Sequence, residues 1–204
     1  MTRSVTAIAC GILSLFSIAC VAGRPIHYYA IDHPSVTEAA AKPDGLVLLV
    51  GRITTAEALQ DSRIRYRTGG NEVGAYEYHR WTERPGLMVQ ELLLQALRAS
   101  GRYRQVQEAS SAGPGDYLIR GKLDEFSEID EPSIFSRVSL HLELLERKSG
   151  LAIWDRQYNH DEPVDGKNMK EVVLSMQHNL QEVIVDAASG IEGFLSSQSE
   201  GAKR

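Results

Sequence analysis

Cysteine is nearly absent from this sequence of 204 residues, which contains only Cys10 and Cys20. Cys10 lies within an apolar N-terminal run that is typical of a cleaved signal peptide, so we expect only Cys20 to remain in the mature protein. If Cys20 carries a lipid, no thiol is left for a disulfide, a metal or a nucleophilic reaction. Acylation of Cys20 would therefore exclude cysteine chemistry from the functions of this chain.

Basic residues are not in excess either. The chain has 22 Lys and Arg residues against 27 Asp and Glu residues, which gives a formal net charge of −5. Proteins that bind nucleic acid nonspecifically through its phosphates present a basic surface. We therefore predict no nucleic-acid partner.

Motifs of catalysis and of phosphate or dinucleotide binding are also missing. The sequence has no Gly-x-Ser-x-Gly, no His-Glu-x-x-His, no Gly-x-x-x-x-Gly-Lys and no Rossmann fingerprint. Its glycine cluster, residues 69–74, lies between strand-like segments and is interpreted as a turn, because no helical pattern follows it. We predict no catalytic residues, and a hydrolase whose site carries no such motif stays open as the weaker alternative.

Histidine and carboxylate side chains are scattered along the sequence. His160-Asp161-Glu162 comes nearest to a metal-ligand cluster, but it lies beside Pro163 in a predicted loop, and no further ligand stands at a suitable spacing. The acidic stretch at residues 124–131 lacks the glycine and the spacing of a calcium loop. We interpret that stretch as a solvated strand face running into a loop, and we predict no metal and no cofactor.

The N-terminal segment carries the strongest local signal. Residues 5–19 form an apolar run of about 15 residues, which is short for a spanning helix and suits the core of a signal peptide. Ser17-Ile18-Ala19 before Cys20 resembles a bacterial lipobox, in which the cysteine receives a diacylglycerol, although Leu usually stands in place of Ser17. We predict lipid attachment at Cys20. The alternative is a plain secretory peptide that leaves a soluble protein.

The rest of the chain is predicted to form one α+β domain, in which an antiparallel-rich sheet is packed by two main helices. Periodic apolar positions place these helices at about residues 85–100 and 168–196. Strands are predicted at residues 27–31, 46–50, 64–67, 73–79, 103–107, 116–129, 135–147 and 151–158. The predicted segments are a signal peptide (1–19), a lipid anchor and proline-broken tether (20–45), the domain (46–196) and a polar tail (197–204).

Two segments resemble those of a known family. One is Tyr28-Tyr29-Ala30-Ile31 near the predicted anchor, and the other is residues 78–88, YHRWTERPGLM, at the start of the first predicted helix. With residues 92–106 and 117–123, they resemble the ABC-type transport auxiliary lipoprotein family. In that family a Tyr-Tyr-x-Leu segment follows the anchor and a Trp-x-x-x-Pro segment introduces the first helix. The resemblance covers most of the mature chain.

The resemblance implies a non-catalytic lipoprotein of a Gram-negative envelope that works with transporter subunits of the mammalian-cell-entry type to move lipid between membranes. Val21 follows Cys20 in place of the Asp of an inner-membrane retention signal, so we expect the outer membrane, with the domain facing the periplasm. A homo-oligomer stays open. The alternative function is an envelope lipoprotein that regulates a peptidoglycan synthase by docking on it.

Five residues of these segments are candidate partner contacts: Tyr28, Tyr29, Tyr78, Trp81 and Pro85. The residues alone leave structural roles open as well. Tyr78 and Trp81 stand just before a helix start, where an aromatic ring can pack on Leu87 or Met88. The tyrosine pair at 28–29 would serve equally as an edge strand or as a contact with lipid headgroups.

Overall fold

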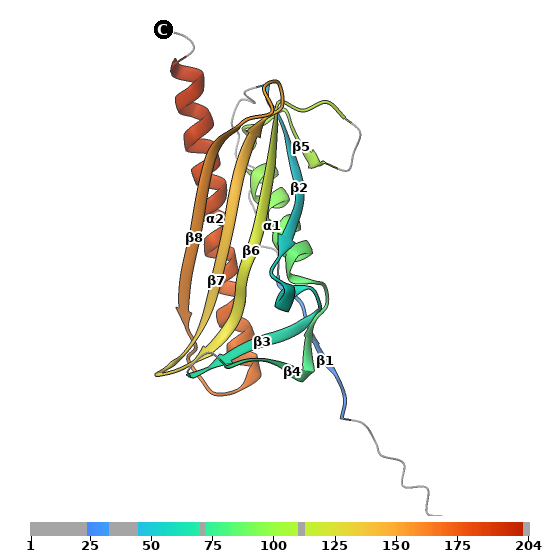
Figure 1. Ribbon diagram of the computed structural model, residues 1–204, viewed down its shortest axis with the longest axis vertical. Helices are drawn as coiled ribbons and strands as arrows, with labels where there is room; N and C mark the ends of the chain where they lie inside the picture. Colours follow the sequence, from blue (N-terminus) through green and yellow to red (C-terminus); the bar gives the residue numbers. More distant parts are fainter. Residues whose placement is uncertain (1–23, 33–44, 70–71, 110–112, 202–204) are drawn as a thin grey trace, which may run out of the picture.

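The computed structural model describes residues 24–32, 45–69, 72–109 and 113–201. The predicted signal peptide, Cys20 and most of the predicted tether lie outside this part of the chain. One sheet of eight strands is covered on one face by two helices, which confirms a single α+β domain (Figure 1).

The helices are α1 (Pro85–Ala99) and α2 (Met169–Gly201), with a short 3-10 helix, η1, at Glu57–Leu59. The strands are β1 (His27–Tyr29), β2 (Val47–Thr55), β3 (Arg63–Thr68), β4 (Glu72–Trp81), β5 (Gln105–Glu108), β6 (Tyr117–Asp130), β7 (Ile134–Glu146) and β8 (Ala152–Pro163).

Strand β6 organises the sheet. One of its edges pairs antiparallel with β7, which pairs antiparallel with β8. Its other edge is shared, because parallel β2 takes the first half and parallel β3 takes the last four residues. Beyond β2 lies β5, and beyond β3 lie β4 and then β1. The longest pairings are antiparallel as expected, yet the sheet is mixed.

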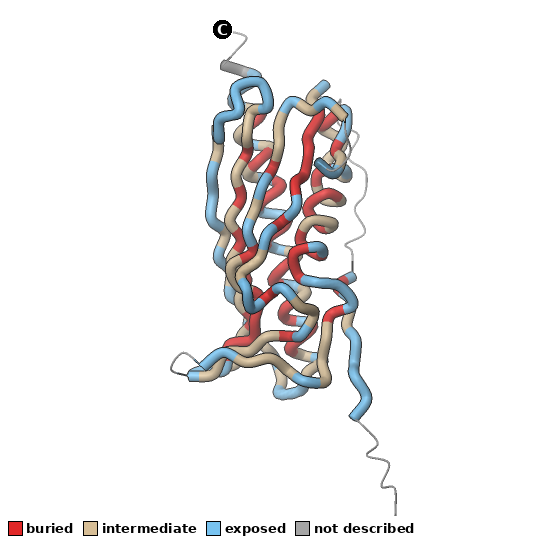
Figure 2. Tube along the Cα trace, turned by 45° about the vertical axis from the view of Figure 1, so that its right-hand side comes forward, coloured by how far each residue is buried: buried red, intermediate tan, exposed pale blue. Residues whose placement is uncertain are grey.

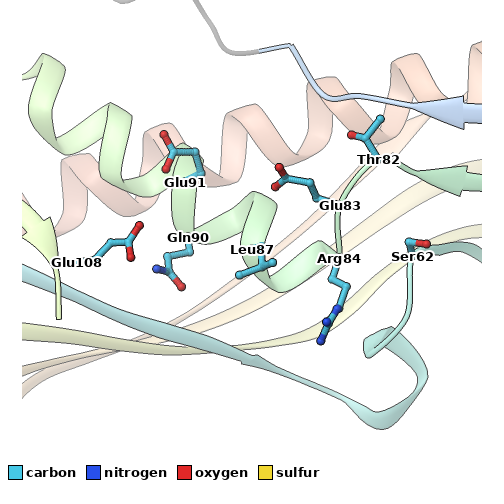
Figure 3. Close-up of a pocket in the computed structure, with 8 residues that line it drawn as sticks. All are labelled: Ser62, Thr82, Glu83, Arg84, Leu87, Gln90, Glu91 and Glu108. Atoms are coloured by element: carbon cyan, nitrogen blue, oxygen red, sulfur yellow. The ribbon is translucent and has the colours of Figure 1, made fainter. Parts of the chain in front are cut away.

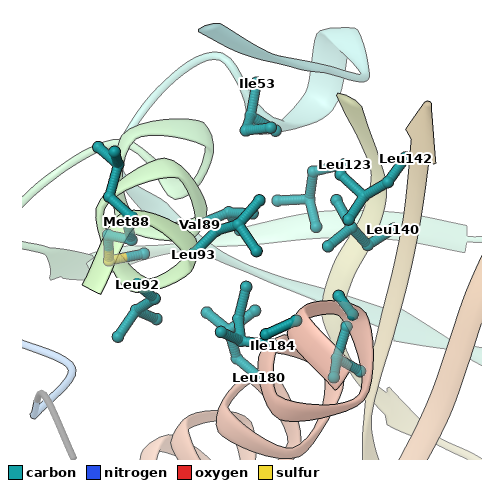
Figure 4. Close-up of a cluster of buried hydrophobic side chains, with 14 of the residues drawn as sticks. Ile53, Met88, Val89, Leu92, Leu93, Leu123, Leu140, Leu142, Leu180 and Ile184 are labelled. Atoms are coloured by element: carbon teal, nitrogen blue, oxygen red, sulfur yellow. The ribbon is translucent and has the colours of Figure 1, made fainter. Parts of the chain in front are cut away.

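The sheet has one dry face, because inward and outward side chains alternate along its strands. The inward positions of β7 are fully buried: Val138, Leu140, Leu142 and Leu144. Between them, Ser139 and His141 face the open side and bond across to Asn159 and Asp155 of β8. The helices pack on the dry face through apolar stripes (Figures 2 and 4). This burial is the principal source of stability of the domain.

Strand β8 is longer than the sequence indicated. His160, Asp161 and Glu162 were expected in a loop, and this expectation is wrong, because all three pair with β7 as strand residues. His160 faces α2, where its Nδ1 lies 3.0 Å from Oδ1 of the fully buried Asn179. The Asn179 amide also donates to the Ser136 carbonyl, at 2.8 Å. Polar pairing with the helix therefore holds this end of the strand in the sheet.

The two ends of the domain differ. β1, β3 and β4 gather at one end, and the last turns of α2 lie at the other (Figure 1). The chain enters the domain at the β1 end, through residues 24–26, which are exposed (Figure 2). This end also holds both segments that carry the family resemblance.

Candidate functional site

The described residues hold no group of three or more His, Cys, Asp and Glu side chains that could bind a metal ion. In that part of the chain, no helix is long and apolar enough to cross a membrane. The surface around the turn from β4 into α1 is the more informative region, because three hollows meet there.

Trp81 fixes the position of this turn. Its side chain is 1% exposed and stacks on Phe126 of β6, with 5.2 Å between ring centroids. Its backbone N–H donates to the Ser62 carbonyl, and the N–H of Thr82 donates to the carbonyl of Tyr29. The turn is thus bonded to the segments on both sides of it while a large aromatic ring anchors it in the core.

Helix α1 begins directly after the turn. Pro85 occupies its first position, where a missing N–H costs nothing, and Arg84 is the N-cap residue with an extended backbone. A Cβ atom at Gly86 would lie 2.8 Å from the carbonyl oxygen of Ile53. Only glycine therefore lets the helix start this close to β2.

Two larger hollows share Arg84 and Leu87 as lining residues. The first, of about 580 Å³, extends towards β5 and the outer side of α1 (Figure 3). The second, of about 390 Å³, extends towards η1 and β2. A third hollow, of about 120 Å³, shares Thr82 and Glu83 with the first and reaches Ile31. We call these three hollows together the helix-start groove.

The groove combines one exposed apolar side chain with charge of mainly one sign. Leu87 is 45% exposed on α1. Carboxylates line the first hollow, contributed by Glu83, Glu91 and Glu108 (Figure 3). An apolar contact ringed by polar groups is the usual arrangement of a site for a protein partner. This combination suits the groove to binding.

A second group of titratable residues lies beside β1. The Tyr29 hydroxyl is 2.9 Å from Nδ1 of His79, and the ring of His79 stacks on that of His27 at 5.3 Å. The hydroxyl of Tyr76 donates to Oε2 of Glu128 over 2.7 Å. None of the three hollows is lined by these residues, and we assign them to holding β1, β4 and β6 together.

Burial shifts the pKa values of three of these side chains. The pKa of Glu128, which is 5% exposed, is raised by burial, and its hydrogen bond from Tyr76 offsets only part of the effect. The pKa of Tyr76 is raised well above its ordinary value by burial and by Glu128. The pKa of His79 is lowered, mainly by burial and also by the neighbouring charge of His27.

We expect the lowered pKa of His79 to make the domain less stable in acid. The unfolded chain binds the proton more tightly than the folded chain does, so this stability is complete above about pH 6.5 and declines as the pH falls towards the lowered pKa. In His79→Gln the difference in melting temperature between about pH 7.5 and about pH 5.5 should be smaller than in the wild type. Equal differences in the two proteins would contradict this assignment.

The structure brings the predicted contact residues to one region but gives them different surroundings. Tyr29 pairs with Trp81 across β1 and β4, and Tyr28 is 61% exposed on the edge strand. Tyr78 lies partly exposed on β4, whereas Pro85 and Trp81 are buried. Of the two roles open to Trp81, the structure therefore supports the structural one, with Phe126 as a stacking partner.

Other residues of this region were missed from the sequence. Glu108 reaches the groove from β5, and Ser62 comes from the segment before β3. Neither lies near the turn in sequence, so no local pattern marks them. Glu128 was expected on a solvated strand face, and this is wrong. Glu128 lies on the inward face of β6, as does Phe126 two residues earlier. The alternation of inward and outward residues along the strand could have indicated that Glu128 is buried.

A mixed sheet covered on one face by two helices defines the class as an α+β domain. Residues 29–188 match the model of a protein family described as "ABC-type transport auxiliary lipoprotein component". The chain therefore belongs to this family of transport auxiliary lipoproteins, as the resemblance of its two segments indicated. No curated protein matches the sequence.

Solved structures are similar to this chain at low sequence identity. Protein XCC0632 from Xanthomonas campestris superposes with a TM-score of 0.74 at 20% identity, over 84% of this chain and 99% of that one. An uncharacterized protein superposes with a TM-score of 0.65 at 15% identity, over 82% and 99% of the two chains. The PelC dodecamer from Paraburkholderia phytofirmans gives a TM-score of 0.46 at 16% identity, over 73% and 93%.

Proposed function

We propose that this protein is a non-catalytic lipoprotein of the outer membrane that assists an ABC-type transporter of the mammalian-cell-entry type in moving lipid between membranes. The family match over residues 29–188 carries the proposal. An auxiliary component acts on its transporter by contact. The helix-start groove is a suitable contact surface, because several of its lining residues, among them Arg84 and Leu87, belong to a segment that carries the family resemblance.

The predicted lipid at Cys20 supports the location. In this proposal the lipid holds the chain at the membrane while the domain faces the periplasm and binds transporter subunits. Of the candidate contacts, Tyr28 is exposed and Tyr29 and Tyr78 are partly exposed at the β1 end of the domain. Trp81 and Pro85 would act indirectly, by fixing the turn that shapes the groove.

Co-purification tests this function. The tagged protein should be recovered from detergent-extracted native membranes together with transporter subunits, identified by mass spectrometry, whereas Cys20→Ser protein should be released from the membranes by a wash in about 0.5 M salt. Recovery of a peptidoglycan synthase in place of a transporter would overturn the proposal and favour the alternative of a synthase regulator.

We expect Leu87→Asp to reduce transporter recovery by about tenfold or more, because it replaces the exposed apolar contact of the groove with a fourth carboxylate. The melting temperature should hardly change, since Leu87 is 45% exposed. Leu151→Asp is the matched control, since Leu151 is 65% exposed in the turn between β7 and β8. Equal recovery of the two variants would show that the groove is not the contact surface.

A further inference from the structure

The open face of the sheet carries a second unassigned surface at the β1 end. Tyr28 pairs with Arg80, and Arg80 pairs with Arg63, so these three residues form one row across β1, β4 and β3. The next residue of β4, Trp81, and the next residue of β3, Ile64, are both buried in the core. Because successive side chains of a strand point to opposite faces, the row lies on the face that the helices leave open.

Positive charge exceeds negative charge in this row. Arg63 and Arg65 share a single carboxylate, Asp61, at 2.6 and 2.9 Å. Arg80 has no ion-pair or hydrogen-bond acceptor within the part of the chain that the structure describes, and its Nε atom is buried without a partner. A positive site therefore exists in a protein whose net charge is −5.

The chain that enters β1 adds apolar, aromatic and basic side chains. Ile26 is 41% exposed and Tyr28 is 61% exposed. The guanidinium of Arg24 lies 5.9 Å from the ring centroid of Tyr78. We define the β1 patch as Arg24, Ile26, Tyr28, Arg63 and Arg80. Two carboxylates, Glu77 and Asp61, lie beside the patch. The patch and the neighbouring Arg65 together supply four guanidinium groups, so positive charge is in excess.

The length of the tether favours a membrane as the occupant of this patch. Arg24 follows Cys20 by four residues, and four residues span at most about 14 Å when fully extended. A lipid on Cys20 would therefore keep the patch close to the phosphate groups of the same membrane. Tyrosine, a large apolar residue and arginine together are typical of protein surfaces at such an interface.

We propose that the β1 patch binds the phosphate groups of an anionic phospholipid surface and holds this end of the domain against the membrane that carries its anchor. The inference rests on the Cys20 anchor of the proposed function. The patch faces the membrane, and the helix-start groove stays available for the transporter. Contact between the patch and the lipid would thus orient the groove relative to the membrane and help to retain the protein there.

Vesicle co-sedimentation tests the patch without a transporter and without the attached lipid. Protein with Cys20→Ser should bind vesicles that contain phosphatidylglycerol and should bind phosphatidylcholine vesicles weakly. Raising the salt concentration from about 0.1 M to about 0.5 M should release it, because phosphate contacts at a surface are screened. Binding that is equal for both lipids, or absent for both, would overturn the inference and leave the transporter test unaffected.

Substitutions locate the contact. In the same Cys20→Ser background, Arg24→Gln and Arg80→Gln should each weaken binding about fivefold, and Tyr28→Ser should weaken it further. The matched control, Arg147→Gln with Leu151→Ser, alters exposed residues at the opposite end and should bind like the parent protein. If the patch variants bind like this control while their melting temperatures are unchanged, the surface has another partner and the proposal is wrong.

Discussion

Trp81→Ala is expected to lower the free energy of unfolding by about 3–5 kcal/mol. The side chain is 1% exposed, stacks on Phe126 and sits where the backbone of the turn bonds to Ser62. Its removal would leave a cavity beneath the start of α1. Urea denaturation monitored by circular dichroism measures the loss.

Trp154→Ala separates this effect from the general cost of losing a tryptophan. Trp154 is half-buried on the edge strand β8, where it stands 6.5 Å from the ring of Tyr158. We expect a clearly smaller destabilisation there. If Trp81→Ala unfolds at the wild-type urea concentration but no longer recovers the transporter, Trp81 would be a direct contact and its assignment to the core would be wrong.

Leu180→Ala should lower the free energy of unfolding by about 2–5 kcal/mol. Leu180 is fully buried on α2 and belongs to the cluster in which both helices meet the sheet (Figure 4). Leu174, on the same helix, is 47% exposed, so Leu174→Ala removes the same atoms from a site without such packing. A melting temperature that is equally affected by both changes would mean that α2 is not packed as described.

Local patterns predicted the helices well. The apolar stripe of α2 placed its start within one residue of Met169, and Pro85 marked the start of α1. Both signals act within one or two turns of the chain, so they can be seen without knowledge of the fold. The end of α2 was missed by five residues, because the polar sequence after Ser196 carries no stripe.

Long-range pairing could not be seen in the same way. The parallel neighbours of β6 are β2 and β3, which lie about fifty or more residues earlier in the chain, and no residue of either strand specifies this partner. His160 was placed in a loop because it stands close to Pro163. Its place in β8 depends on Asn179, nineteen residues further along.

The candidate site also has a part that could be predicted from the sequence and a part that could not. The two family segments were identified from their residues, but only the register shows that Tyr29 lies beside Trp81. The groove itself depends on Glu108 and Ser62, which approach the turn from other strands. Residues within one segment were therefore predictable, and the surface that several segments build together was not.

The segment that follows β1 is hydrogen-bonded to α2 through Asp32. The N–H of Asp32 donates to Gln177, and Gln181 donates back to the carbonyl of Asp32. The chain that leaves β1 is therefore attached to the first half of a helix of 33 residues, whose length is about 50 Å. If the proposed lipid on Cys20 holds the chain at a membrane, α2 acts as a rigid spacer, which sets how far from the lipid surface the opposite end of the domain stands.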